Sequence, residues 1–225
     1  MKKIMVLSAI GLAMMLGACS NTVDNSGKTP STTKTTTSKV SQKKKKDNRE
    51  VVNGELLKPG QWLNDDFEGK VTLEKIWTPN VDISDGPLTA KITTVKILKT
   101  EPKTKDQLSD AKDSYQTNSI TNPYYTIQVS YELTNTSDQE VGFNGIDSIV
   151  TTTGQQLSPD SYLQDSGIGT TMAAHGTKKI YAVGLLNDGD YSKIKDIAIT
   201  LGSVYETEEY NNISDGSDAI KINLE

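Results

Sequence analysis

After residue 50, apolar and polar residues alternate along much of the chain. In the clearest segment, apolar side chains at the odd positions from Tyr125 to Leu133 alternate with polar ones at the even positions from Thr126 to Thr134. A period of two places these two sets on opposite faces of a β-strand. The same reasoning predicts further strands, bounded by turn residues, at 71–77, 89–99, 146–153, 178–186, 196–201 and 219–224.

Helical periodicity is weak by comparison. Residues 105–115 carry only Leu108, Ala111 and Tyr115 on one stripe, which predicts a short helix or a loop. The apolar positions change parity between Ile92 and Val95, which predicts a β-bulge or burial on both faces. About seven strands without βαβ alternation favour an all-β fold, a two-layer antiparallel β-sandwich over residues 53–225.

The chain begins with the features of an export signal. Lys2 and Lys3 precede a thirteen-residue, largely apolar run over residues 4–16, which is shorter than a membrane span. The run ends in Leu16, Gly17, Ala18 and Cys19, and this sequence resembles the lipobox of bacterial lipoproteins. The resemblance implies that residues 1–18 form a signal peptide and that Cys19 is lipidated. The alternatives are an ordinary secretory signal with a chance cysteine, or an uncleaved membrane helix.

Composition separates the segment after Cys19 from the rest of the chain. Residues 19–52 are rich in Ser, Thr and Lys and nearly free of large apolar groups, so this segment is predicted to be a disordered tether. Residues 1–50 hold ten basic and three acidic side chains, which leaves fourteen basic and twenty-six acidic for residues 51–225. The expected location is therefore the outer face of the cell membrane, with an acidic folded domain standing off the bilayer.

Four consecutive lysines, residues 43–46, offer a candidate polyanion-binding segment. A solvated spacer is the simpler interpretation. If the run binds a partner, an anionic lipid or a wall polymer such as teichoic acid fits an exported protein. A nucleic-acid partner is disfavoured, because the folded part is acidic and no aromatic residues interleave the lysines.

The strand led by Tyr124 and closed by the Asn-Thr turn at Asn135 resembles the hallmark strand of Gram-positive lipoproteins with a telokin-like immunoglobulin fold. Gly154 and the turn that ends in His175 and Gly176 extend the resemblance over roughly residues 88–201. It implies an immunoglobulin-like sandwich and a surface location. It implies no catalytic residues, because the family has no established chemistry.

Candidate chemistry is sparse. One cysteine and one histidine cannot form a disulfide or a zinc site of the usual Cys/His type, so no cofactor or metal is expected. His175 lies beside a turn glycine without a recognisable nucleophile motif, and we interpret it as an exposed turn residue. Acidic groups that could attract calcium fail the spacing of a calcium loop. They occur at Asp65 and Asp66, Asp188 and Asp190, and Glu206, Glu208 and Glu209.

Two smaller features complete the sequence pattern. The tetrapeptide Ile-Ser-Asp-Gly occurs at 83–86 and again at 213–216, and two Asp-Gly turns explain the repetition. Nine tyrosines against two phenylalanines allow either a recognition surface or ordinary strand packing. Tyr162, Tyr191, Tyr205 and Tyr210 are the tyrosines expected in or near loops or strand ends.

Two functions remain open from sequence. The first is a lipid-anchored, extracytoplasmic binding or structural module without catalytic residues, whose partner is an envelope polymer or protein. The second is a carboxylate-dependent hydrolase of cell-wall polymers, which requires two acidic residues to converge in a cleft.

Overall fold

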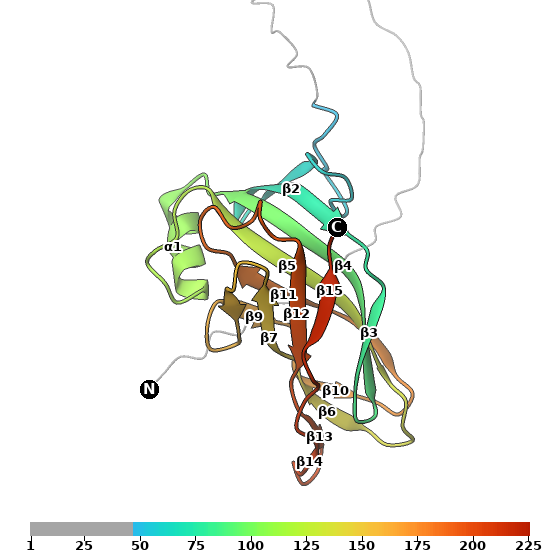
Figure 1. Cartoon of the computed structure of the whole chain (residues 1–225). Coiled ribbons are helices and arrows are strands. Elements are labelled where there is room, and N and C mark those ends of the chain that lie inside the picture. The colour runs from blue at the N-terminus through green and yellow to red at the C-terminus, as the bar shows by residue number, and fades with distance from the viewer. Residues whose placement is uncertain (1–46) are drawn as a thin grey trace, which may run out of the picture. The chain divides into compact units, whose positions relative to one another are not determined.

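The computed structural model describes residues 47–225, which form fifteen β-strands and one α-helix (Figure 1). The predicted signal peptide, Cys19 with its preceding Leu16, Gly17 and Ala18, and residues 19–46 of the predicted tether lie outside the described residues. Every pairing between named strands is antiparallel, so the predicted all-β antiparallel class is confirmed.

One layer of the fold is a seven-stranded sheet in the order β1-β2-β4-β5-β11-β9, with β3 paired to the first part of β4. Its long central strands supply most of the pairing. The strands are β1 (Trp62–Asp65), β2 (Gly69–Trp77), β3 (Val81–Asp85), β4 (Leu88–Glu101), β5 (Tyr124–Asn135), β9 (Leu163–Asp165) and β11 (Thr177–Leu185).

The other layer contains two four-stranded sheets. Their orders are β10-β6-β13-β14 and β15-β12-β7-β8. The first comprises β6 (Val141–Asn144), β10 (Ile168–Met172), β13 (Val204–Glu206) and β14 (Asn212–Ser214). The second comprises β7 (Ile146–Thr151), β8 (Gln156–Leu157), β12 (Asp196–Leu201) and β15 (Ile220–Asn223).

Two glycines join these sheets into one bent layer. Gly145 separates β6 from β7, and Gly202 lies between β12 and β13. The Gly202 N–H donates to the Gly145 carbonyl at 2.7 Å, so both strands bend at the same place. A Cβ atom on Gly202 would lie 3.1 Å from the carbonyl oxygens of Asn144 and Gly145, which explains why glycine suits this crossing.

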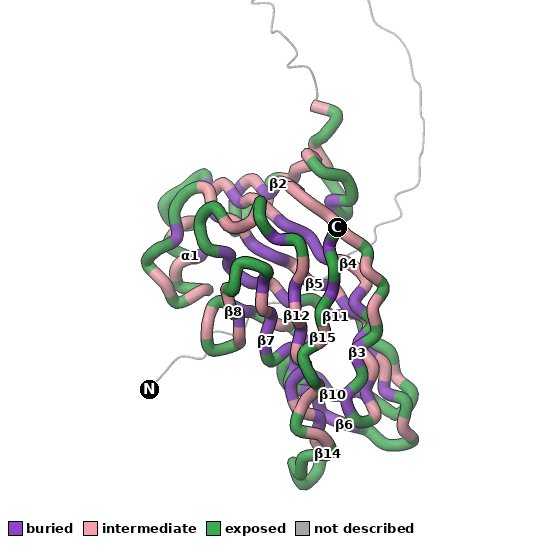
Figure 2. The backbone as a smooth tube through the Cα atoms, viewed as in Figure 1, coloured by how far each residue is buried: buried purple, intermediate pink, exposed green. Residues whose placement is uncertain are grey.

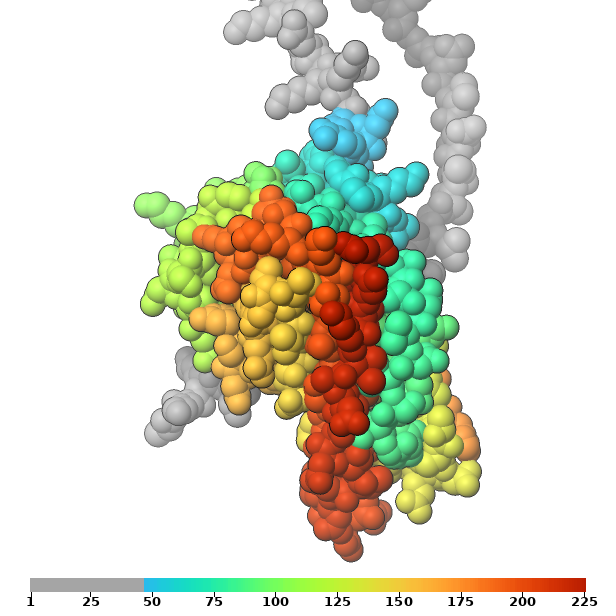
Figure 3. Space-filling view, in the orientation of Figure 1, coloured from blue at the N-terminus to red at the C-terminus, as the bar shows by residue number. Residues whose placement is uncertain are grey.

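The hydrophobic core lies between the two layers and draws side chains from all three sheets, as the buried segments in Figure 2 indicate. Ile127, Val129, Tyr131 and Leu133 of β5 are at most 1% exposed, so the alternation seen in the sequence places its apolar face inward. Burying a side chain of this size stabilises the fold by about 1.5–3 kcal/mol. The strand β15 lies beside β3 at one edge of the sandwich (Figures 1 and 3).

Each strand predicted from the sequence has a counterpart, but the total of about seven is wrong because residues 47–225 contain fifteen. The missed strands are two to five residues long. So short a segment shows too few alternations to be recognised in sequence. The predicted bulge is confirmed, since the register between β4 and β5 shifts between Ile92 and Thr94.

The predicted helix or loop is the helix α1 (Lys105–Ser114). Thr104 and Gln107 form a capping box at its start, which satisfies two backbone donors of the first turn. The Gln107 side chain also donates to the Asp66 carbonyl at 3.0 Å, which ties the helix to the β1–β2 turn. Within residues 47–225, the chain contains no helix long and apolar enough to cross a membrane.

The first described residues already pair with the sheet. The Val51 N–H donates to the Trp62 carbonyl at 2.8 Å, and the Trp62 N–H donates to the Arg49 carbonyl at 3.0 Å. These bonds place residues 49–51 in the folded unit, ahead of the boundary at residue 53 that composition predicts.

Candidate functional site

A groove of about 670 Å³ lies on the face of the seven-stranded sheet that is turned away from the sandwich core. Its floor is the polar face of the central strands. Lys96 of β4 lies opposite Gln128 of β5, and Ser130 of β5 lies between Thr94 of β4 and Tyr181 of β11. From Tyr124 to Glu132 the groove follows eight residue steps of β5, a length of about 27 Å at 3.4 Å per residue.

Two small apolar clusters flank this floor. On one side, Leu56 packs against Val71 and Leu73, which holds the segment before β1 on the sheet. At the start of β5, Ala111 of α1 packs with Ile120, Tyr124 and Leu185. These two apolar clusters form the sides of the groove, and the polar face of the central strands forms its floor.

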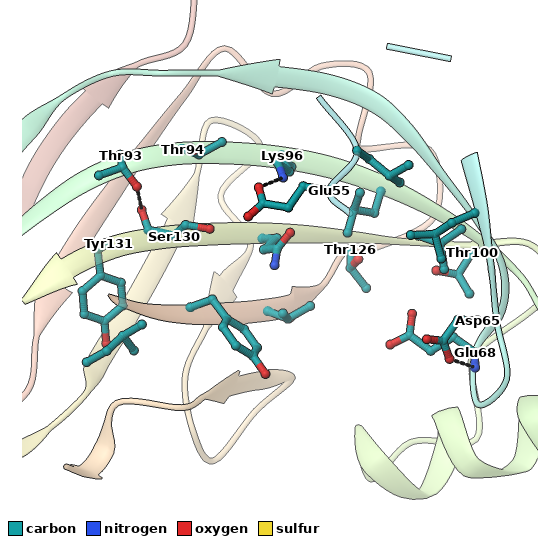
Figure 4. Close-up of a pocket in the computed structure, with 18 of the residues that line it drawn as sticks. Glu55, Asp65, Glu68, Thr93, Thr94, Lys96, Thr100, Thr126, Ser130 and Tyr131 are labelled. Carbon is teal, nitrogen blue, oxygen red and sulfur yellow. Dashed lines mark hydrogen bonds and ion pairs between the residues drawn. The ribbon is translucent and has the colours of Figure 1, made fainter. Parts of the chain in front are cut away.

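Lys96 lies in the middle of the groove (Figure 4). The residue is 7% exposed, and its ammonium is 3.5 Å from a carboxylate oxygen of Glu55. Among residues 47–225 this is its one polar side-chain contact, and the Glu55 side chain is itself 78% exposed. A buried ammonium requires a compensating charge or hydrogen bonds.

Asp65 and Glu68 lie together at one end of the groove, in the turn between β1 and β2 (Figure 4). The Asp65 carboxylate accepts the backbone N–H groups of Phe67 at 2.7 Å and Glu68 at 2.9 Å, which fixes the turn. Glu68 remains accessible to solvent, but the protein around its carboxyl and the nearby charge of Asp65 raise its pKa. The two carboxyl groups therefore differ in environment.

Two tyrosines line the same end. Burial and the charge of Glu68 raise the pKa of Tyr124 to about 12. Burial, followed by Tyr124 and Glu68, also raises the pKa of Tyr115. Both phenols thus stay protonated at neutral pH and can act as neutral hydrogen-bond donors beside the carboxyl pair.

The opposite end of the groove is held by a hydrogen-bond network below Tyr181. The Tyr131 hydroxyl donates to the Asp165 carboxylate at 3.0 Å, and the N–H groups of Ile146 and Gly167 donate to it at 2.6 and 2.7 Å. Burial raises the pKa of Asp165, and these donors oppose that effect. Ser166 in turn bonds the backbone of Tyr181, so this network positions β11 at the groove floor.

Apart from Asp65, the residues singled out from sequence lie outside the groove. His175 is a 64% exposed turn residue with φ of 56°, 2.9 Å from Asp138, as its interpretation as a turn residue requires. Asp188 and Asp190 lie in a surface turn, and Glu206, Glu208 and Glu209 border an open depression with Glu140. Across residues 47–225, no group of three or more His, Cys, Asp or Glu side chains could hold a metal ion.

The repeated tetrapeptides meet in space, which the sequence did not indicate. The Ser214 hydroxyl donates to the Asp85 carboxylate, and Gly86 lies against Ile213 and Ser214. Asp85 is 7% exposed, so the contact stabilises a buried carboxylate and joins β3 to β14. The two copies therefore act as one structural contact between the layers.

Sequence reasoning missed most of the groove. Of the groove's acidic residues, the sequence pattern singled out only Asp65 as a candidate ligand. It grouped Asp65 with its neighbour Asp66, whereas the structure places Asp65 beside Glu68. The polar face of β5 was visible as alternation, but a solvent-facing strand gives the same pattern as the floor of a groove. The one additional signal is a lysine, Lys96, between two apolar neighbours of a strand.

The fold and the groove define an all-β, antiparallel sandwich protein with one open polar groove on its larger sheet. No protein-family model matches the chain, and neither does any curated protein. Solved structures that are similar to it share low identity. A functionally unknown protein from Listeria monocytogenes EGD-e has 15% identity and a TM-score of 0.45. The match covers 68% of this chain and 86% of the Listeria chain.

The structural-genomics target SoR45 has 11% identity and a TM-score of 0.34, over 62% of this chain and 89% of its own. An uncharacterized β-sandwich protein from Clostridium difficile 630 has 16% identity and a TM-score of 0.25, over 76% of this chain and 95% of its own. None of these descriptions supplies an activity, a ligand or a partner for this chain.

Proposed function

We propose that the chain is a lipid-anchored binding module of the bacterial cell envelope, held at Cys19 on the outer face of the cytoplasmic membrane. In this proposal it belongs with the Gram-positive lipoproteins that carry a telokin-like immunoglobulin domain. The sequence from Leu16 to Cys19 and the basic, apolar start support the anchor. Two acyl chains on one cysteine suffice for stable attachment to a bilayer.

The observation that carries the binding role is the groove. It is long and open. Its floor carries hydroxyl and amide groups of β4 and β5 beside the charged Lys96, Glu132 and Lys179, and Tyr181 is 54% exposed. Such a lining suits an extended polar chain, because it supplies hydrogen bonds along its length and an aromatic surface at one end.

Two experiments test this role. A Cys19→Ala variant is expected to lose lipid modification and to leave the membrane fraction. If the variant keeps its lipid, Cys19 is not the site of the anchor. For the groove, a photo-crosslinking residue is placed at Ser130, with a control at the exposed Asp147 of the other layer. Envelope material should be captured in intact cells at position 130 and not at position 147. Equal capture at both positions would exclude the groove as the binding site.

A second candidate, a carboxylate-dependent hydrolase of wall polymers, is favoured by one observation. Asp65 and Glu68 meet at the groove end, and the pKa of Glu68 is raised. A carboxyl with a raised pKa suits a general acid, with a second carboxylate nearby as its partner. Purified full chain with wall glycan should then release reducing ends, and Glu68→Gln should abolish the release. Absence of release from the wild-type chain would exclude this candidate.

A further inference from the structure

Among the charged residues described in the groove lining, Lys96 is the buried one. It is 7% exposed, yet its one ion-pair contact within residues 47–225 is the 3.5 Å approach of Glu55. A charge-assisted hydrogen bond between these groups is normally about 2.8 Å long. Glu55 lies on the segment before β1, and its exposed side chain can turn into solvent without disturbing the sheet. The ammonium is thus available to a stronger acceptor.

Lys96 has apolar neighbours on its β2 side, where Ile76 lies opposite it, and neutral polar neighbours towards β5. Gln128 lies directly opposite on β5, Ser130 follows on the same face, and Thr94 precedes Lys96 on β4. Their amide and hydroxyl groups can donate hydrogen bonds to an oxygen atom placed over the ammonium. An oxyanion would gain a charge-assisted bond to Lys96 together with neutral donors around it. A neutral hydroxyl in the same place would leave the ammonium without a counter-charge.

We propose that Lys96 binds an oxyanion of the groove ligand, and that this ligand is an otherwise neutral polyhydroxylated chain bearing isolated carboxylates. The inference rests on the proposed binding role of the groove and specifies its ligand. Isolated charges are favoured over a dense polyanion, because residues 51–225 carry fourteen basic and twenty-six acidic side chains. That excess repels a polymer with a negative charge on every residue more strongly than a glycan with a carboxylate on every second sugar. Tyr181, on the same floor, provides an exposed ring for a sugar unit.

The test compares two glycans that differ in their carboxylates. The first is a soluble strand of alternating N-acetylglucosamine and N-acetylmuramic acid, freed of its peptides so that each muramic acid carries a carboxylate. The second is a chito-oligosaccharide of the same length, which is neutral. Calorimetry with the full chain should show at least tenfold tighter binding of the carboxylate strand, equivalent to about 1.4 kcal/mol. Equal affinity for the two glycans, or tighter binding of lipoteichoic acid than of either, would overturn the proposal.

Three substitutions locate the effect. Lys96→Met keeps the length of the side chain and removes its charge, so it should abolish the preference for the carboxylate strand. Lys91→Met, at an exposed position of the same strand outside the groove, should leave the preference unchanged. Glu55→Gln removes the competing carboxylate and should tighten binding of the carboxylate strand several-fold.

The opposite signs of Lys96→Met and Glu55→Gln distinguish a binding lysine from a structural ion pair. If the pair only holds the segment before β1, both substitutions should lower the melting temperature and neither should change the preference between glycans, and that result would overturn the proposal. Failure of the proposed function gives a different outcome, in which position 130 captures no envelope material in cells. Capture at position 130 without a carboxylate preference would refute the ligand class alone.

Discussion

Replacing Gly167 by alanine tests how closely the turn between β9 and β10 packs on the buried Tyr131. A Cβ atom at position 167 would lie 2.3 Å from the Tyr131 hydroxyl oxygen and 3.0 Å from an oxygen of Asp165. Tyr131 is 1% exposed and its hydroxyl is bonded to Asp165, so its ring cannot swing into solvent. Either the turn or the ring must shift, and the hydrogen bond between Tyr131 and Asp165 is then lost.

The magnitude follows from these two effects. Overpacking of this kind costs about 1–3 kcal/mol, and a hydrogen bond to a charged group contributes about 1.5–3 kcal/mol. Gly167→Ala should therefore lower the free energy of unfolding by about 4 kcal/mol. Tyr131→Phe alone should cost about 2 kcal/mol. The double variant should cost about 3 kcal/mol rather than the sum of 6 kcal/mol, because phenylalanine removes the atom that the new methyl group meets.

Urea denaturation of the four proteins measures this cycle, provided that the slope with denaturant stays constant. Additivity of the two single substitutions within about 0.5 kcal/mol would refute the reasoning, because uncoupled residues add to that precision. Ser166 bonds the backbone of Tyr181, so Gly167→Ala should also weaken ligand capture in the groove.

Three further predictions follow from single contacts. The raised pKa of Glu68 means that the folded chain holds this proton more tightly than the unfolded chain, so this residue should lower stability as pH rises above about 4.3. Glu68→Gln should remove this contribution, so its melting temperature should fall less between pH 4 and 8 than that of the wild-type chain; parallel curves would contradict the prediction. Asn135→Ala should cost about 3 kcal/mol in chemical denaturation, because the amide nitrogen of this fully buried side chain shares its two N–H donors among three backbone carbonyls within 3.1 Å, whereas the exposed Thr136→Ala should change stability much less. Ser214→Ala should cost about 2 kcal/mol, since the second oxygen of Asp85 already has no partner among residues 47–225; an unchanged unfolding midpoint would show that the contact is not stabilising.

Much of the larger sheet could be predicted from the chain. The alternation from Tyr125 to Leu133 gave both the strand and its buried face, and the change of parity after Ile92 gave the bulge in β4. The turn after Asn135 was also predicted. In the structure the side-chain oxygen of Asn135 accepts the Ser137 N–H at 3.0 Å. These features are local, because each depends on residues a few positions apart.

The groove could not be predicted from the local sequence pattern. Lys96 and Glu55 are forty-one positions apart, and their contact depends on the segment before β1 folding back over the sheet. Asp65 and Glu68 are close in sequence, but the raised pKa of Glu68 depends on the protein packed around the turn. A pattern of polar residues on a strand does not reveal whether the face meets open solvent or a walled groove.

By itself, the sequence determined the strand-rich class and the inward face of β5, since periodicity is a property of neighbouring residues; export and the anchor at Cys19 stay predictions from a short linear signal. Tertiary structure alone decided that Ser214 bonds Asp85, that Gly145 and Gly202 bend one layer together, and that the polar strip of β4 and β5 becomes the floor of a groove. The physical reason is that burial, ion pairing and close backbone contact depend on segments that meet only when the two layers pack.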